Sequence, residues 1–501
     1  MEIAGQLINR KTAVETTHPF TRLQGRNFVM SFASSSTILD AADTILVTPV
    51  DRFFRKFSKG LAILLLGLLS QTSEAAEKVL LKATPQEGSC LTVRMAVETE
   101  GELRLNADGK KVRQTPVEVK ANFLFDEKIT SQGAGKVDSV RYYREADAKI
   151  KLGENAFEAQ LGDNQALIGV AARVDGVTLF CPHGPLTRDQ LELLDVQGGS
   201  TVLAALLPEE EKEVKEEWEV GVAALVPLLR LDAIVKSNVT AQLIEVKDGA
   251  AVVSVNGPVS GMIDGIATEI TLKGKLSVDL EKETVAWLVL SINETRSIGH
   301  AQPGFETKTL VRMATLAAKT PPELTVDVLD KLVLTPTASG QLLKFTSPSG
   351  KFRLQHERQW RMMTEAANVT IFRMVDKGDL VAQLDVAALP PLEAGRQLSL
   401  EEFTASTQRT IGPSFQQIVE ASQAETESGL RVLRVTAVGM VDKLPIQWIC
   451  CHFSDADGRR ASYAFTLEAS LSDRFGGADQ TLINSLQLLS PQPSVKTARK
   501  P

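Results

Sequence analysis

The segment Leu91–Val97 reads LTVRMAV, with an apolar side chain at every odd position and a mostly polar one at every even position. The same period of two returns at Val117–Phe123, which reads VEVKANF. Because successive side chains of a strand point to opposite faces of a sheet, this alternation predicts strands with one buried and one wet face. We therefore predict an α+β fold that is mostly antiparallel β.

Residues 77–318 carry this pattern through most of their length, and Ile270–Leu280 and Val285–Leu290 are further predicted strands. Between them, Asn256–Gly265 (NGPVSGMIDG) holds glycines at a density typical of bulges or tight hairpins in a strongly curved sheet. In its order of a Trp-led strand, a Gly-rich hairpin and long strands, the region 218–315 resembles the half-barrels of exported lipid- or ligand-holding proteins. This resemblance implies a curved β-sheet or half-barrel domain.

One helix is predicted to interrupt the β-rich region. Thr187 and Gln190 fit a T-x-x-Q capping box, in which the two side chains satisfy free backbone donors at a helix start. The acidic run Glu209–Glu217 then divides the region into two halves near 208–217. We interpret that run as a solvated linker, because contiguous glutamates lack the alternating oxygen ligands of a calcium loop.

The chain has 501 residues, of which 43% are hydrophobic and 23% charged, and its formal net charge is −7. This composition is that of a globular protein with two or three domains. The mild acidic balance argues against nucleic-acid binding, which needs basic side chains to neutralise phosphates.

A Pro-containing linker is predicted at 319–340, opened by Lys319–Glu323 (KTPPE). After it, Phe345–Leu354 (FTSPSGKFRL), followed by Trp360, resembles the opening strand of PsbP/Mog1-like domains. The resemblance departs from that family's usual opening at His356–Arg358.

Later segments of 341–490 keep the element order of the PsbP/Mog1-like family. Ser399–Glu402 is an S-x-x-E capping box that predicts a helix, and predicted strands lie at 369–374, 431–438, 445–453 and 462–467. The resemblance implies a sheet covered by helices, a packing role for Trp360, and an accessory or binding module rather than a catalytic one.

Residues 52–75 have the order of a Sec-type signal peptide. Basic residues from Arg52 to Lys59 precede the apolar run Leu61–Leu69, and Ser73 and Ala75 suit the −3 and −1 positions of a cleavage site. We predict export to the periplasm or extracellular space, with no integral membrane span in the mature chain. Retention as a signal anchor is the alternative. We expect 1–51 to be a poorly ordered lead with a mis-assigned start, and 491–501 to be a disordered tail.

A search for catalytic and cofactor motifs finds none. The sequence contains no G-x-S-x-G elbow, P-loop, G-x-G-x-x-G, H-E-x-x-H or C-x-x-C. Cys181-Pro182-His183 is the one tempting combination of a thiol and an imidazole, and we interpret Cys181 as a buried or half-buried residue at a strand end. We therefore predict no catalytic, cofactor-binding or metal-binding residues, and leave open whether the protein is an enzyme.

The cysteines leave further alternatives. Cys90 and Cys181 both lie at predicted strand ends, so they could form a disulfide in an oxidising compartment. Cys450 and Cys451 are adjacent on a predicted strand, and we expect their side chains to face opposite sides of it.

Three functional hypotheses follow. The first is a non-enzymatic envelope or extracellular protein in which the curved sheet holds an apolar ligand or a protein partner and the PsbP/Mog1-like domain mediates assembly. The second is an envelope hydrolase using distant carboxylates, with Glu145, Asp147 and Asp264 among the acids that could pair. The third is a structural subunit of a larger complex.

Overall fold

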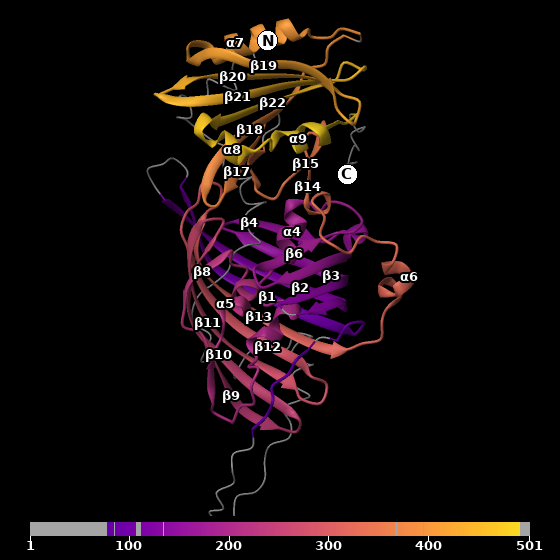
Figure 1. Ribbon diagram of the computed structural model, residues 1–501, viewed down its shortest axis with the longest axis vertical. Helices are drawn as coiled ribbons and strands as arrows, with labels where there is room; N and C mark the ends of the chain where they lie inside the picture. Colours follow the sequence, from indigo (N-terminus) through magenta and orange to yellow (C-terminus); the bar gives the residue numbers. More distant parts are fainter. Residues whose placement is uncertain are drawn as a thin grey trace, which may run out of the picture.

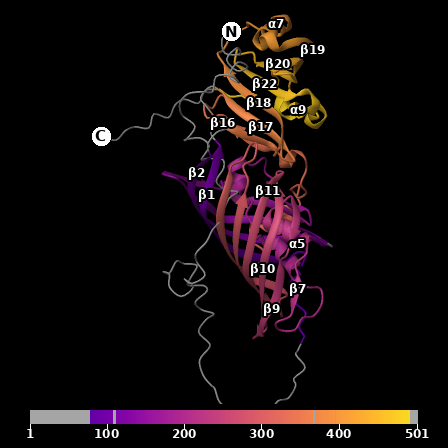
Figure 2. The ribbon, with the colours of Figure 1, turned by 90° about the vertical axis from the view of Figure 1, so that its left-hand side faces the viewer.

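A computed structural model describes residues 78–490, except 85, 107–111, 134, 366–368 and 394. The predicted lead at 1–51, the signal peptide at 52–75 and the tail at 491–501 lie outside the described residues. Figures 1 and 2 show two β-rich parts at opposite ends of the long axis, a large curved sheet and a smaller C-terminal part.

The large sheet contains 13 strands in the order β6-β5-β3-β2-β1-β13-β12-β11-β10-β9-β7, with β4 beside β3 and β8 beside β10. Its strands are β1 (Cys90–Asn106), β2 (Val112–Gly133), β3 (Lys136–Leu152), β4 (Asn155–Gln160), β5 (Leu167–Arg173), β6 (Gly176–Phe180), β7 (Glu217–Glu219), β8 (Ala233–Ser237), β9 (Thr240–Lys247), β10 (Ala250–Ile263), β11 (Ile266–Asp279), β12 (Thr284–Arg296) and β13 (Gly304–Ala317). All of the ladders are antiparallel, and the pairing of β1 with β13 joins the two halves of the region into one sheet.

The alternation seen in the sequence sets the two faces of this sheet. In β1, Val93, Met95 and Val97 are buried, whereas Arg94 is exposed. The buried face packs against α4 (Arg188–Leu194), the 3-10 helix η3 (Ser200–Leu206) and α5 (Val222–Leu229). The sheet curves around α5 in Figure 1.

The linker lies against the opposite face of the large sheet. It contains the short helices η4 (Pro322–Leu324), α6 (Val326–Leu329) and η5 (Ser339–Gln341). Leu324 and Leu329 pack with Cys90, Val140 and Leu167 in a small cluster.

The C-terminal part has a 7-stranded antiparallel sheet in the order β16-β17-β18-β22-β21-β20-β19 and a 3-stranded sheet in the order β14-β15-β23. The strands are β14 (Leu343–Thr346), β15 (Phe352–His356), β16 (Trp360–Glu365), β17 (Thr370–Asp376), β18 (Asp379–Leu389), β19 (Phe415–Glu425), β20 (Arg431–Val441), β21 (Leu444–Ser454), β22 (Arg460–Glu468) and β23 (Gln487–Leu488). Its helices are α7 (Leu400–Ile411), α8 (Ser472–Phe475) and α9 (Asp479–Ser485), with the 3-10 turns η6 (Gly412–Ser414) and η7 (Ala469–Leu471).

The structure confirms both capping boxes and the mostly antiparallel α+β fold. Thr187 caps α4 with Gln190 as its partner, and Ser399 caps α7 with Glu402. Trp360 is fully buried in the C-terminal core, as predicted. The prediction that a single helix interrupts the β-rich region is wrong at α5, because this short apolar helix begins after Gly221 and contains Pro227, so its sequence has no helical period.

Candidate functional site

The inner face of the large sheet is a continuous apolar surface. Val311 and Met313 of β13 lie opposite Val97 and Met95 of β1, and Leu288, Leu290 and Ile292 of β12 extend the same buried face. Opposed residues of an antiparallel pair share a face, so the ladder aligns these side chains across strands.

A stretch of chain occupies this inner face. We name residues 195–231 the inner segment; it contains η3, the short edge strand β7 and α5, with the residues that join them. Leu225, Leu228 and Leu229 of α5 are fully buried against the strands. Arg230 ends α5 in a left-handed conformation with φ 58°. The inner segment thus covers the apolar inner face of the sheet.

A buried ion pair fixes one end of the inner segment. Arg141 Nε donates to Glu127 Oε1 at 2.7 Å, and their side chains are 6% and 1% exposed. Ser200 at the start of η3 donates to the other oxygen of Glu127 and accepts from Arg141 Nη2 at 3.1 Å. Because a buried charge needs both a counter-charge and hydrogen bonds, Ser200 completes this site.

A second buried ion pair joins the neighbouring stretch of the inner segment. Arg296 donates to Glu294 within β12, and Gln197 Nε2 donates to Glu294 Oε2 at 3.2 Å. The same amide lies 3.2 Å from the Leu229 carbonyl oxygen. Arg230 Nε donates to the Val196 carbonyl oxygen at 3.2 Å and lies 3.1 Å from Asp195. Polar contacts therefore fasten both ends of the segment around its apolar helix.

The sequence contains a signal for these charges. In the alternation of β2, Glu127 occupies an inward position like the buried Phe123 and Phe125. In β12, Glu294 occupies an inward position like Leu290 and Ile292. A charged residue at the buried parity of an alternating strand must find a partner in the core. Its partner depends on strand register and on loops, which single-strand patterns do not provide.

The junction between the large sheet and the C-terminal part is rich in arginine. Arg188 of α4 donates to the carbonyl oxygens of Arg358 and Trp360 at 2.6 and 3.1 Å. In the reverse direction, Arg358 donates to the Leu179 carbonyl oxygen, and Arg361 Nη2 donates to Asp264 Oδ2 at 2.6 Å.

Burial shifts the titration of groups at this junction. It raises the pKa of Glu192 to about 7, although Arg188 and Arg361 favour the carboxylate. It also lowers the pKa of His356 to about 3, and the charge of Arg188 acts in the same direction.

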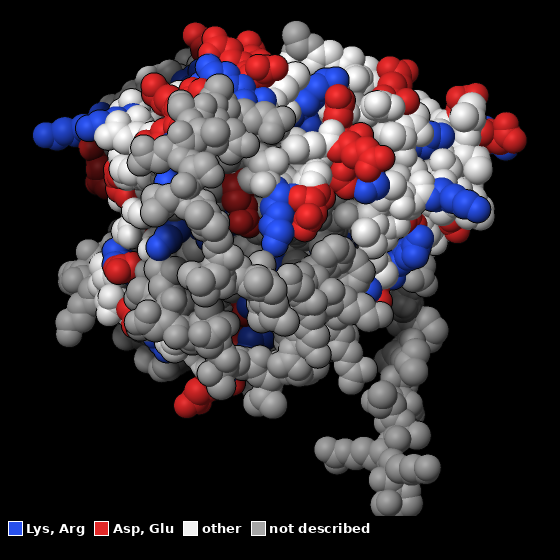
Figure 3. All heavy atoms as spheres, turned by 90° about the horizontal axis from the view of Figure 1, so that it is seen from below, with Lys and Arg blue, Asp and Glu red and all other residues white. Residues whose placement is uncertain are grey.

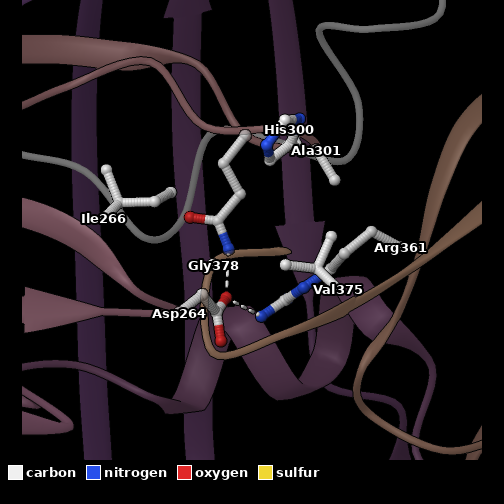
Figure 4. Close-up of a pocket in the computed structure, with 8 residues that line it drawn as sticks. Asp264, Ile266, His300, Ala301, Arg361, Val375 and Gly378 are labelled. Carbon is white, nitrogen blue, oxygen red and sulfur yellow. Dashed lines mark hydrogen bonds and ion pairs between the residues drawn. The ribbon is translucent and has the colours of Figure 1, made fainter. Parts of the chain in front are cut away.

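Two hairpin turns meet beside these arginines. Gly265 (φ 71°) of the β10–β11 turn packs against Gly378 (φ 89°) of the β17–β18 turn, where a Cβ added to Gly265 would lie 2.4 Å from Gly378. Figure 4 shows the adjoining hollow, with Asp264 directed at Arg361. The hollow offers about 10 Å³, which is the room that one water molecule needs. It is too small for a sugar ring or peptide.

The carboxylates named in the sequence are not brought together as a catalytic pair. Glu145 is exposed on β3, and Asp147 is half-buried two residues later. Asp264 lies in the junction, where Arg361 and Gln302 donate to it and its own N–H donates to Asp232. Glu127 and Glu294 are buried, but each is bound by an arginine.

The cysteines do not form the disulfide that the sequence left open. Cys90 packs under the linker on the outer face, whereas Cys181 belongs to the inner core, and both are free. Burial raises the pKa of Cys181, and the next-but-one residue His183 is exposed, which agrees with a packing role. Cys450 and Cys451 face separate clusters on the two sides of β21, as predicted.

The surface of the described residues adds two observations. Figure 3 shows basic and acidic side chains interspersed over the described part of one end of the molecule, so no field of single sign covers it. Within residues 78–490, allowing for the gaps given above, no helix is long and apolar enough to cross a membrane, and no group of three or more His, Cys, Asp or Glu side chains is placed to hold a metal.

No family model matches the chain, and no curated protein sequence matches it. Among solved structures, it is similar to cyanobacterial PsbP (CyanoP) from Synechocystis sp. PCC 6803, with 12% identity over 31% of this chain and 97% of that one, at a TM-score of 0.25. It is also similar to a protein of Bacteroides thetaiotaomicron VPI-5482, with 13% identity over 30% of this chain and 49% of that one, at a TM-score of 0.22. The translocator domain of the autotransporter NalP from Neisseria meningitidis matches 76% of this chain and 88% of its own length at 7% identity, with a TM-score of 0.10. The match to PsbP agrees with the resemblance stated from the sequence, and these likenesses concern the fold alone.

Proposed function

We propose that this protein is an exported, non-enzymatic binding protein of the cell envelope or extracellular space. In this proposal, its large sheet holds an apolar ligand against the inner face, and its C-terminal domain mediates assembly with a partner. The observation that carries the proposal is the aligned apolar inner face, occupied by a separate stretch of chain rather than by another sheet. A ligand would bind by taking the place of α5 on that face.

The open ends of the sheet support this route. β6 and β7 end the strand order, and within the described residues they do not pair with each other. The inner segment belongs to the sheet through β7, whose ladder with β9 is only three residues long, so its departure would leave the ladders between the longer strands intact. Its side-chain hydrogen bonds to the buried carboxylates come from Ser200 and Gln197, and hydrogen bonds to charged groups each contribute about 1.5–3 kcal/mol.

A fluorescent apolar probe tests this proposal. We expect N-phenyl-1-naphthylamine to bind the chain that starts near Ala76 with a rise in fluorescence. Leu225→Ala should strengthen that binding several-fold, because the inner segment loses a fully buried side chain that seats it. Leu482→Ala is the matched control, since it removes the same atoms from a fully buried site in the C-terminal core. Equal probe binding by the two variants would contradict displacement of the inner segment.

Export is tested separately. Intact-mass measurement on the native protein should give a chain that starts near Ala76, found outside the cytoplasm. A cytosolic protein that retains residues 1–75 would exclude this part of the proposal.

A further inference from the structure

Two threonines on the inner face of β13 interrupt its apolar surface. Thr307 and Thr309 share the buried parity of Phe305 and Val311. Both side chains are at most 1% exposed, and within the described residues neither hydroxyl has a hydrogen-bond partner. A buried hydroxyl without a partner costs about 1–3 kcal/mol, so valine would be the more stable choice for a purely apolar core.

Strand register places further polar groups beside these hydroxyls. Thr307 lies opposite Glu294 on β12, and Thr309 lies opposite Thr99 on β1. Arg296 follows Glu294 on the same face and is paired with it. We name these five residues the polar zone. Next to it along β13, the inner face is apolar at Val311 and Met313.

The inner segment covers the polar zone. Gln197 donates to Glu294, and a Cβ added to the next residue, Gly198, would lie 3.2 Å from the Val311 side chain. The stretch that a ligand would displace therefore lies over the two unpartnered hydroxyls.

The charge of the polar zone limits what it can receive. Glu294 and Arg296 neutralise each other, so a carboxylate or ammonium group entering here would remain a buried charge without its own counter-ion. An uncharged group with hydrogen-bonding oxygens would instead satisfy Thr307 and Thr309 and restore a fully bonded interior.

We propose that the polar zone binds the uncharged, hydrogen-bonding head of an amphiphile whose hydrocarbon tail lies along the apolar inner face. This inference rests on the proposed function and adds the class of ligand to it. The hydroxyls of Thr307 and Thr309 hold the head, and the apolar side chains of Val311 and Met313 contact the tail.

The test compares three ligands with one tail. Decanol, decanoate and decyltrimethylammonium each compete with N-phenyl-1-naphthylamine for the exported chain. We expect decanol to displace the probe at a concentration at least about 5-fold lower than either ion does, which corresponds to roughly 1 kcal/mol.

The variant Thr307→Val/Thr309→Val should abolish this preference for decanol. Its thermal stability should equal or exceed that of the parent, because two unpartnered hydroxyls are removed. Thr268→Val is the matched control, since that buried hydroxyl already donates to the Ile266 carbonyl oxygen at 3.1 Å. The control should keep the preference.

Each remaining outcome overturns the inference in a recognisable way. Absence of probe binding in the parent chain removes the proposed function together with the inference. Probe binding without a preference for decanol, or a preference that survives the double variant, removes the inference alone. Loss of probe affinity in the double variant shows that the two threonines act on packing and not on the ligand head.

Discussion

The two large cores of this protein are built from different side chains. The inner face of the 13-stranded sheet is mainly aliphatic, with two ion pairs buried in it. The C-terminal core instead contains the interlocking aromatic residues Trp360, Phe372, Phe453, Tyr463, Phe465 and Phe475. Trp360 meets Phe465 and Phe475 in edge-to-face contacts at centroid distances of 5.9 and 6.5 Å.

This difference indicates in which core one apolar group can take the place of another. Aromatic pairs have directional contacts, so replacing one partner leaves a misshapen space. Aliphatic side chains have no such geometry, and a hydrocarbon can replace Leu225 or Leu228 against them without loss of contact type. We therefore expect the large sheet to be adaptable and the C-terminal core to be rigid.

The largest expected effect concerns autonomy of the C-terminal domain. The main C-terminal cluster and the smaller cluster under α7 lie within residues 345–488, including their partly buried members. The fragment 341–490 should therefore fold alone and unfold cooperatively in denaturant. A fragment without a cooperative transition would refute this domain boundary.

Trp360→Ala should destabilise that fragment by about 3–5 kcal/mol, through lost transfer energy and the cavity left behind. The indole is fully buried against two other rings. Denaturant titration measures the change. A loss below about 1 kcal/mol would place the side chain outside the core.

Glu127→Gln should destabilise the large sheet by about 3 kcal/mol, because it leaves Arg141 as a buried charge without its counter-ion. Glu98→Gln is the control: its pair with Arg312 is 44% and 34% exposed, and its loss should cost at most about 1 kcal/mol. The free energies of unfolding of the two full-length variants give the comparison. Equal losses would show that burial does not strengthen the inner pair.

Glu192→Gln tests the junction through pH. The folded-state pKa of Glu192 is about 7, above its unfolded value, so its contribution is most favourable at low pH and is lost as pH rises through 7. The glutamine variant should gain stability relative to the parent between pH 5 and 8, on the order of 2 kcal/mol. Subtracting the free energies of unfolding of the two proteins cancels the opposite contribution of His356. Its lowered pKa stabilises the folded state at pH values above the pKa of an unfolded histidine. A pH-independent difference would show that Glu192 stays ionised.

The smallest expected effect separates two neighbouring cysteines. Cys451 faces the aromatic core with no exposure, whereas Cys450 lies under α7 and keeps 8%. Cys451→Ser should cost about 1 kcal/mol more than Cys450→Ser, because its hydroxyl is more completely buried. Denaturant titration of both variants decides it, and equal values would mean that the two sides of β21 are equally dry.

The sequence predicted features that depend on local chemistry. Alternation located β1 and β2 and assigned their buried faces, and the capping boxes located the starts of α4 and α7. It could not locate β19, because that edge strand is exposed on both faces and has no period of two. Less of the site could be predicted from the sequence. The alternation of β2 places Glu127 on the buried face, but its contact with Ser200 depends on a loop 73 residues away.

The pairing of β1 with β13 sets the order in which the large sheet can form. Arg104 and Glu306 form a diagonal ion pair across this ladder, although 202 residues separate them in the chain. Contacts of such long sequence separation form slowly, because the intervening chain must lose its conformational freedom before the ladder rewards it. During synthesis, β1 lacks its second neighbour until residue 317 has emerged. In that interval one side of β1 exposes unpaired backbone, so the nascent chain has a period of aggregation risk that ends only when β13 arrives.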